Sequence, residues 1–319
     1  MKYSFVLPAY KAAFLRESID SILNQTYKDF ELIIVNDASP EDLTSIVNSY
    51  QDERIQYYVN EKNVGGTDLV AQWNHCITYA QGEYLILASD DDVYHPDYLE
   101  KMDVLVDKYP NVNVFRPRVQ YINSLGDVLK IDEKFEELVS HTACMYLVQQ
   151  KKLISGVPFY VFKHQALKDM GGFVNFPSAW FSDDATAIQL AKDGMVIHQE
   201  VLFSFRNSGL NISSTLNTIS LLMKKLSATE LYYLWLAREL KMVVDNDFVK
   251  SFQPKLNIDK LSHIEWLIMN SNRQATCSCG SLLRKVTSLS FSERVSLCGR
   301  VYRRKIKNKC RYLISRYFN

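Results

Sequence analysis

The chain has 319 residues, with a hydrophobic fraction of 47%, a charged fraction of 23% and a net charge of +1, as expected for a soluble globular protein. No run reaches the roughly 18 uninterrupted apolar residues that a membrane-spanning helix needs. The apolar start, Met1 to Pro8, is too short for a signal peptide, so we expect a cytoplasmic protein.

Strand and helix patterns alternate over the first 110 residues. The predicted strands are Tyr3–Leu7, Glu31–Val35, Ile55–Val59 and Glu83–Ala88, and the predicted helices are Phe14–Leu23, Pro40–Tyr50, Leu69–Ala80 and Pro96–Tyr109. Ser39 is the expected N-cap of the second helix. Several of the strands are continuously apolar, which is typical of strands buried on both faces. The pattern predicts the α/β class, with a mostly parallel sheet flanked by helices.

The rest of the chain is less regular and then becomes helical. A strand is expected at Val112–Ile122 and a helix at Asp183–Lys192, and long helical patterns cover Ile219–Lys241 and Ile258–Met269. Residues 281–319 hold eleven Lys or Arg and one acid, Glu293, so this segment carries +10 and residues 1–280 carry −9. An acidic body without a base-reading motif argues against nucleic-acid binding.

Three aspartates, Asp90, Asp91 and Asp92, directly follow the apolar strand that ends at Ala88. Like charges so close together raise one another's pKa unless a cation neutralises them. A hard divalent cation, Mg²⁺ or Mn²⁺, takes oxygen ligands and usually keeps substrate phosphates among them. In open α/β sheets, ligands bind beyond the carboxyl ends of strands, where this triple is expected. The alternative is a solvated acidic turn before the next helix.

Glycine-rich phosphate loops are absent. The chain has no GxGxxG after the first strand and no GxxxxGK[ST], which disfavours dinucleotide binding and an NTPase-type loop.

Ordered motifs over roughly the first 215 residues resemble those of the family 2 glycosyltransferases, which have the GT-A fold. The motifs are the opening Val6–Tyr10, the stretch from Ser18-Ile19 through Gln25-Thr26 to Glu31–Ser39, and the segment from Gly82 through Asp91-Asp92 to His95-Pro96-Asp97. Each is weak alone, and their order makes the resemblance specific. It implies that residues 1–110 bind the nucleotide sugar and that residues 111–215 form the acceptor side with the catalytic base. Residues 216–319 would form a helical C-terminal region with the basic tail.

The resemblance also implies a nucleotide-sugar donor, most simply a UDP-sugar, a Mn²⁺ or Mg²⁺ ion, and transfer with inversion. Asp37 matches the aspartate that binds the donor base, and Pro8 and Tyr10 match the lining of the base pocket. Asp92 matches the metal ligand, with Asp91 toward the ribose or a metal-bound water. The acceptor would be a saccharide or lipid-linked saccharide in cell-surface polysaccharide synthesis.

For the base, Asp183-Asp184 matches the family's Glu-Asp pair, which places Asp184 at the catalytic-base position. The alternative is that both residues only cap the following helix. Trp180, just before the pair, is a candidate wall for the acceptor sugar or a core residue, and Tyr10 is a base-stacking residue or a core tyrosine.

Three departures from the family pattern leave points open. Ser89 stands where the family often has the first aspartate, with Asp90 in the middle position, so Asp90 is a further candidate ligand. Asn74 belongs to Gln72-Trp73-Asn74, which replaces the family's Ala-Arg-Asn. Ser208 stands in place of a frequent metal-binding histidine, within Arg206–Ser213.

Two other function classes compete with this interpretation. A non-catalytic nucleotide-sugar-binding protein would keep Asp37 and Tyr10 but lack the metal or base residue. A nucleotidyltransferase would need a Gly- and Lys/Arg-rich first loop, whereas Pro8–Ala13 holds one lysine and no glycine.

The basic tail has two interpretations. Its apolar residues recur at mostly helical spacing: Leu297, Val301, Cys310, Leu313, Ile314, Tyr317 and Phe318. Its charges include Arg300, Arg303, Arg304, Lys307 and Arg311. This is the pattern of a basic amphipathic helix at an anionic membrane surface, which would make the enzyme peripheral on the inner face of the membrane. It is equally the pattern of a terminal helix packed on the body.

Overall fold

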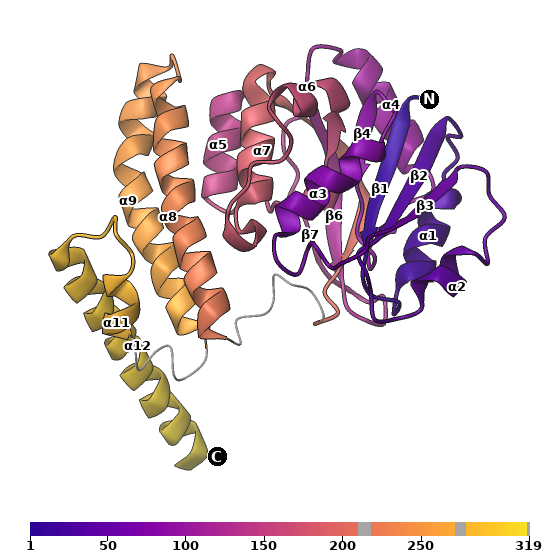
Figure 1. The fold of residues 1–319 in the computed structure, drawn as a ribbon. Helices are drawn as coiled ribbons and strands as arrows, with labels where there is room; N and C mark the ends of the chain where they lie inside the picture. The colour runs from indigo at the N-terminus through magenta and orange to yellow at the C-terminus, as the bar shows by residue number, and fades with distance from the viewer. Residues whose placement is uncertain (210–217, 272–278, 318–319) are drawn as a thin grey trace. The chain divides into compact units, whose positions relative to one another are not determined.

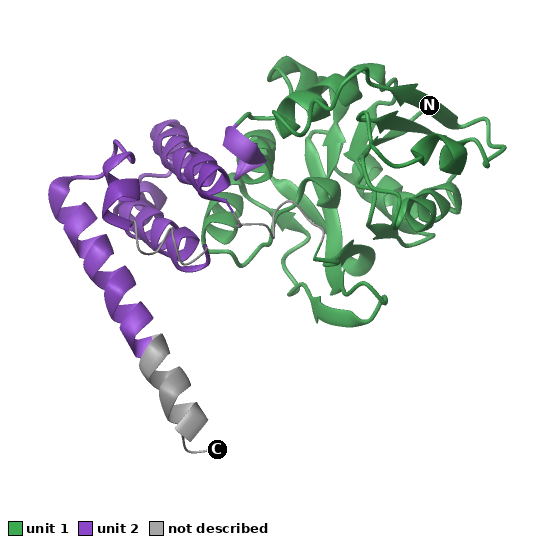
Figure 2. Ribbon diagram, turned by 60° about the horizontal axis from the view of Figure 1, so that its bottom comes forward, with its two compact units in different colours: residues 1–175, 182–211 green, residues 176–181, 212–319 purple. Residues whose placement is uncertain are grey.

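The structure is a computed structural model that describes residues 1–209, 218–271 and 279–317, with side chains described as far as Lys307. The chain divides into two compact units: residues 1–175 with 182–211, and residues 176–181 with 212–319 (Figure 2). We call them the α/β unit and the helical unit and describe each by itself. The predicted domain boundary at residues 215/216 lies outside the described residues.

The α/β unit has a sheet flanked by helices (Figure 1). Its strands are β1 (Tyr3–Ala9), β2 (Phe30–Asn36), β3 (Ile55–Val59), β4 (Tyr84–Leu87), β5 (Val93–Tyr94), β6 (Val114–Ile122), β7 (Val128–Ile131), β8 (Leu138–Val139), β9 (Val161–Lys163) and β10 (Met195–Arg206). Its helices are α1 (Leu15–Leu23), α2 (Leu43–Val47), α3 (Leu69–Cys76), α4 (Tyr98–Lys108), α5 (His141–Gln149), α6 (His164–Asp169) and α7 (Ser182–Leu190). In the described residues these strands form one sheet in the order β3-β2-β1-β4-β9-β6-β10-β5, with β7 on β6 and β8 on β10.

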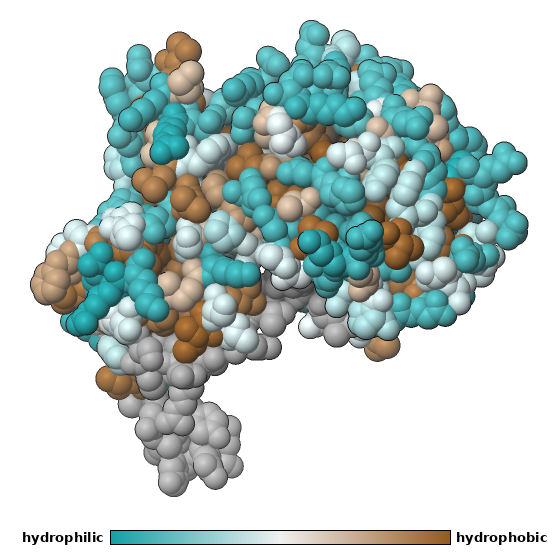
Figure 3. Space-filling model, viewed as in Figure 1, coloured by the Kyte–Doolittle hydropathy of each residue, from teal (hydrophilic) through white to brown (hydrophobic). Residues whose placement is uncertain are grey.

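The first half of the sheet is parallel, and the second half mixes directions. β1 pairs in parallel with β2 and β4, and β2 with β3. β9 then runs antiparallel to both β4 and β6, whereas β10 is parallel to β6. Every residue of β2 and β4 is buried, as the continuous apolar runs predicted. The face of the α/β unit seen in Figure 3 is mainly hydrophilic, with hydrophobic residues in small groups.

A buried polar cluster joins the starts of β1, β2 and β4. Ser4 Oγ donates to Glu31 Oε1 and accepts from Gly82 N at 2.8 Å, and Glu31 is only 1% exposed. A Cβ on Gly82 would lie 2.7 Å from the backbone N of Ser4, so only glycine permits this approach. The cluster fixes the alignment of the three strands whose opposite ends form the site.

The predicted helix after Asn36 is shorter than expected, and its predicted N-cap is wrong. Helix α2 begins at Leu43, and Asp42 is its N-cap, accepting from Ser45 N at 3.0 Å. Ser39 instead belongs to the preceding turn, where its Oγ donates to the carbonyl of Tyr10 at 2.6 Å. Pro40 therefore lies in the turn that follows β2, and not at the first position of a helix.

The helical unit consists of α8 (Ile219–Lys241), α9 (Asn246–Met269), α11 (Cys279–Arg284) and α12 (Phe291–Tyr317), with the segment 176–181. Its buried core includes Leu226, Ile264, Leu283, Leu297 and Val301. Helix α9 begins twelve residues before the predicted start at Ile258. It contains Pro254, and proline ordinarily ends a helix. Here Phe252 and Leu256 on either side of it are buried, and this packing accompanies the continuous helix.

The first part of the basic tail packs on its own unit. Leu297 and Val301 are fully buried, and Arg300 and Arg304 form ion pairs of 3.2 and 2.8 Å with Glu265, itself 3% exposed. For residues 291–307, these contacts agree with the interpretation of a packed terminal helix. The apolar residues from Cys310 onward lie outside the described side chains, and membrane contact of that part stays a prediction. None of the helices in the described part of the chain combines the length and the apolar character of a membrane-spanning segment.

Candidate active site

The site lies where parallel strands β1, β2 and β4 end, because neighbouring parallel strands present their carboxyl ends at one edge of a sheet. The loops after these strands carry Tyr10, Asp37 and Asp90–Asp92, respectively. Two contacts join them: Tyr10 N donates to Asp90 Oδ2 at 2.8 Å, and Ser39 Oγ donates to the carbonyl of Tyr10. The structure therefore brings together the residues that the sequence predicted for donor and metal.

The aspartates after β4 are buried, with exposures of 5% for Asp90 and Asp91 and 0% for Asp92. Ser89 Oγ lies within hydrogen-bonding distance of both Asp91 Oδ1, at 3.0 Å, and Asp92 Oδ2. Burial, and then the neighbouring Asp91 charge, raise the pKa of Asp92 to about 8. Burial also raises the pKa of Asp90. These carboxyls are in an environment that extra positive charge would relieve.

Two basic residues hold this acidic loop, and the sequence analysis assigned a role to neither. Lys11 Nζ lies 3.2 Å from Asp91 Oδ2 and 3.4 Å from Asp90 Oδ1. Arg206, at the end of β10, donates its backbone N to Asp92 Oδ1 and its Nε to the carbonyl of Asp91, both at 2.8 Å. Only their positions in the sequence could have indicated a role for these two residues. Lys11 directly follows Tyr10, and Arg206 is the first residue of the segment that contains Ser208. The part of that segment from residue 210 onward lies outside the described residues.

Asp37 is buried, 5% exposed, and fastens the loop after β3. Its Oδ1 accepts from Val64 N at 2.9 Å and from Asn60 Nδ2 at 2.7 Å, and its Oδ2 accepts from Gly65 N at 2.7 Å. A Cβ on Gly65 would lie 3.0 Å from Asp37 Oδ2, so glycine suits the close approach. Asp37 therefore fixes the path of the loop that follows β3.

Pro8 lies near the end of β1, and Tyr10 directly follows the strand. The Tyr10 side chain is 41% exposed, so it is not a core tyrosine, and Pro8 is half-buried. An exposed ring at this position is available for stacking.

Asp183 and Asp184 start helix α7, as predicted. Asp184 is 4% exposed, and its Oδ2 accepts from Lys151 Nζ at 2.8 Å. Asp183 Oδ1 accepts from the backbone N of Asp184 at 2.9 Å. Burial by the surrounding protein, followed by the Asp184 charge, raises the pKa of Asp183 to about 7, although its side chain keeps partial exposure. Lys151 follows α5 with a φ of 54°, a conformation that favours glycine.

The side chains of the two remaining site candidates, Asn74 and Trp180, contact other groups of the protein. Asn74 Oδ1 accepts from Phe173 N at 2.8 Å and so fastens the turn at Gly172, where a Cβ would lie 2.4 Å from that oxygen. Trp180 belongs to the helical unit, where its ring stacks on Trp266 and lies 4.3 Å from Lys225 Nζ.

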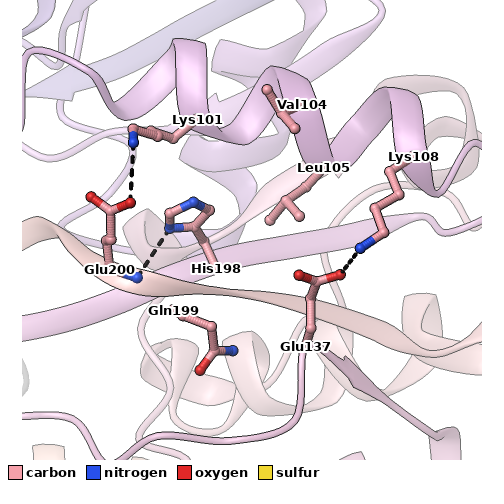
Figure 4. A pocket seen from close by; sticks show the side chains of 8 residues that line it. All are labelled: Lys101, Val104, Leu105, Lys108, Glu137, His198, Gln199 and Glu200. Atoms are coloured by element: carbon pink, nitrogen blue, oxygen red, sulfur yellow. Dashed lines mark hydrogen bonds and ion pairs between the residues drawn. The ribbon is translucent and has the colours of Figure 1, made fainter.

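A pocket of about 390 Å³ lies elsewhere in the α/β unit, between α4 and β10 (Figure 4). Its two lysines are already paired, Lys101 with Glu200 at 3.1 Å and Lys108 with Glu137 at 2.6 Å. None of the predicted site residues lines it. The acidic loop, with its convergent polar groups, is the better candidate site. Within the described residues, no group of three or more His, Cys, Asp or Glu side chains is placed to hold a metal ion.

Comparison with known proteins shows what the first part of the chain is similar to. Residues 4–171 match the model of the family described as glycosyl transferase family 2. An uncharacterised glycosyltransferase of Rickettsia typhi is 38% identical over 112 residues, 35% of this chain and 34% of that protein. The protein CgeD of Bacillus subtilis is 31% identical over 146 residues, 44% of this chain and 32% of its own. The chain thus spans about a third of the length of the curated relatives it matches.

Solved structures show the same fold at low sequence identity. Residues 1–349 of TarS from S. aureus, in complex with UDP-GlcNAc, match with a TM-score of 0.61 and 16% identity, covering 96% of this chain and 92% of that one. The mannosyltransferase PcManGT from Pyrobaculum calidifontis, in complex with GDP-Man and Mn²⁺, matches with a TM-score of 0.54 and 15% identity, covering 96% and 86%.

Proposed function

Because the chain belongs to glycosyl transferase family 2 and is a glycosyltransferase of the GT-A fold, we propose that it transfers a sugar with inversion from a nucleotide-sugar donor. The observation that carries this proposal is the meeting of Tyr10, Asp37 and the Asp90–Asp92 loop at one edge of the sheet. The proposed donor is a UDP-sugar. The proposed acceptor is a saccharide or lipid-linked saccharide in cell-surface polysaccharide synthesis.

Donor recognition is assigned to the ends of β1 and β2. The exposed Tyr10 ring stacks on the base, a contact of about 1–3 kcal/mol in other nucleotide sites, and Pro8 lines the pocket beside it. Asp37 accepts a hydrogen bond from the base. Its carboxylate is already oriented by the two backbone N–H groups of Val64 and Gly65, so little reorganisation accompanies binding.

The acidic loop offers a divalent cation part of its ligands, and the donor would have to supply the others, because no three of the described His, Cys, Asp or Glu side chains are placed to hold a metal ion by themselves. Asp91 and Asp92 offer only oxygen donors, which Mg²⁺ and Mn²⁺ prefer, and burial leaves Asp92 with a raised pKa that a cation would lower. Asp92 is the proposed ligand, with Asp91 and Asp90 beside it, and donor phosphates would supply further oxygens. A bound Mn²⁺ would stabilise the charge that develops on the leaving diphosphate. GDP-Man and Mn²⁺ bound by PcManGT support this part of the proposal.

Proton removal from the acceptor hydroxyl is assigned to Asp184. Inversion takes place in one displacement, so a single carboxylate must lie within hydrogen-bonding reach of the attacking hydroxyl. The start of α7 orients Asp184, and Lys151 Nζ donates to its Oδ2 at 2.8 Å. Asp183 orients the pair by accepting from the Asp184 backbone.

The proposal is tested by a thermal-shift screen of UDP-, GDP- and other nucleotide sugars, each with Mn²⁺ and with EDTA. We expect a UDP-sugar to raise the melting temperature of the wild type in Mn²⁺ and to have little effect on Asp37→Ala. Asp193→Ala, an exposed aspartate outside the site, is the matched control and should respond as the wild type does. If every nucleotide sugar leaves the wild type unshifted with or without Mn²⁺, the donor assignment fails.

A further inference from the structure

Lys11 has an unusual position for a lysine next to a proposed divalent-metal loop. Its ammonium lies between two carboxylates of that loop, 3.2 Å from Asp91 Oδ2 and 3.4 Å from Asp90 Oδ1. Its side chain is 26% exposed, whereas those of its two partners are 7% exposed or less. A partly exposed cation therefore contributes neutralising charge to a buried acidic pair.

The backbone and side chain of Lys11 are held in different ways. Tyr10 N and Lys11 N both donate to Asp90 Oδ2, at 2.8 and 2.7 Å, and these bonds fix the backbone of the first loop. The ammonium is held only at the end of a flexible four-carbon stem. The side chain can therefore swing away from Asp91 while the backbone stays in place.

Arg206 does not duplicate this function. Its Nε donates to the backbone carbonyl of Asp91, and its Nη2 lies 2.5 Å from Glu17 Oε1. Its guanidinium also lies over the ring of Phe14, at 4.3 Å. Arg206 fixes the path of the loop, whereas Lys11 approaches the carboxylate oxygens of Asp90 and Asp91.

We propose that Lys11 is an exchangeable internal counter-ion of the acidic loop: its ammonium neutralises Asp90 and Asp91 in the donor-free enzyme and competes with a divalent cation for Asp91. Once displaced, the ammonium remains tethered beside the loop and pairs with the donor diphosphate. This inference rests on the proposed function, because it takes the acidic loop as the metal site. It makes Lys11 a positioning residue that couples metal binding to diphosphate binding.

The test measures Mn²⁺ binding without any reaction. Free Mn²⁺ is counted by electron paramagnetic resonance during titration of the wild type, Lys11→Met, Lys11→Arg and the control Lys101→Met, which removes a lysine paired with Glu200 away from the loop. Lys11→Met should bind Mn²⁺ alone about 5- to 20-fold more tightly than the wild type, because a like charge close to the cation is removed. Lys11→Arg and Lys101→Met should stay within about twofold of the wild type.

A second titration uses UDP at saturating Mn²⁺. Lys11→Met should bind UDP about 5- to 20-fold more weakly, and Lys11→Arg should restore most of the affinity, since a cation near a diphosphate strengthens its binding. A lysine that only stabilises the loop would give the opposite first result, because its loss would disorder the loop and weaken Mn²⁺ binding. Circular dichroism of each variant confirms that the loop is tested in a folded protein.

Equal or weaker Mn²⁺ binding by Lys11→Met overturns the inference, and so does the absence of Mn²⁺ binding in all four proteins. In that last case, nucleotide-sugar binding measured in EDTA still decides the proposed function on its own. Tight Mn²⁺ binding by Lys11→Met alone, with none detected in the wild type, would support the inference in its strongest form.

Discussion

Replacement of Asp37 should loosen the loop after β3 as well as weaken donor binding. Asp37→Ala leaves the backbone N–H groups of Val64 and Gly65 without the carboxylate that they bond at 2.9 and 2.7 Å. Asn60 Nδ2 keeps its second acceptor, Gln72 Oε1, at 2.9 Å. With roughly 1.5–3 kcal/mol for each hydrogen bond to a charged group, the two lost backbone bonds alone cost about 3–6 kcal/mol of loop stability. Asp37→Asn keeps one acceptor oxygen and should cost about half as much.

Hydrogen exchange measured by mass spectrometry on peptides covering residues 60–68 reads this effect directly. The matched control is Asp42→Ala, which removes one exposed N-cap bond to Ser45 N and should affect α2 only. Peptides over residues 60–68 should exchange faster in Asp37→Ala than in the wild type, and at the wild-type rate in Asp42→Ala. Unchanged protection of those peptides in Asp37→Ala would refute the account of the loop, and an unchanged preference for uracil would remove Asp37 from the base site.

Four further predictions follow from the same geometry. Asp92→Asn should lose metal-dependent transfer while its melting temperature stays near or above that of the wild type, since a neutral amide relieves like-charge repulsion; a wild-type rate in Mn²⁺ would dismiss the ligand assignment. Asp184→Asn should lower kcat by roughly 10²–10⁴-fold with donor binding nearly unchanged, and a fall in donor affinity at constant kcat would make it a binding residue instead. Because the pKa of Asp183 is raised to about 7 in the folded state from the usual 3.8, the unfolded state loses this proton first as pH rises, so the group destabilises the fold progressively between about pH 4 and 7. The melting temperature of Asp183→Asn relative to the wild type should therefore be higher at about pH 8 than at about pH 4.5, and an equal difference at both pH values speaks against the raised pKa. A chain that ends after Lys307 keeps the packed part of α12 and should bind anionic vesicles less well than the full chain at low salt; equal co-sedimentation of the two would rule out the distal tail as an anchor.

Periodicity predicted the strands of the first half of the sheet well, because β2 and β4 contain continuous apolar runs, whereas turn chemistry misplaced the start of α2. The position of Asp90–Asp92 at one edge of the sheet was predicted correctly, because the carboxyl ends of neighbouring parallel strands lie at the same edge. The direction of β9 was not readable from the sequence, since a three-residue strand carries no periodicity. The early start of α9 was missed because proline disfavours a helix locally, whereas the helix includes it where Phe252 and Leu256 are buried.

The partners of the predicted site residues were harder to find than the residues themselves. Lys11 and Lys151 are ordinary loop lysines in the sequence, and only the fold brings them to Asp91 and Asp184. Asp37 illustrates the same point: the resemblance to the family indicated a site residue, but its bonds to Val64 and Gly65 depend on a loop that starts 23 positions away with Asn60.

The most direct test of the central claim is release of nucleoside diphosphate from the donor found in the thermal-shift screen, measured in Mn²⁺ for the wild type, Asp92→Asn and Asp184→Asn. The account predicts release by the wild type, loss of release in EDTA and in Asp92→Asn, and release lowered roughly 10²–10⁴-fold in Asp184→Asn despite normal donor binding. Equal release by all three proteins, or release that is indifferent to EDTA, would contradict it.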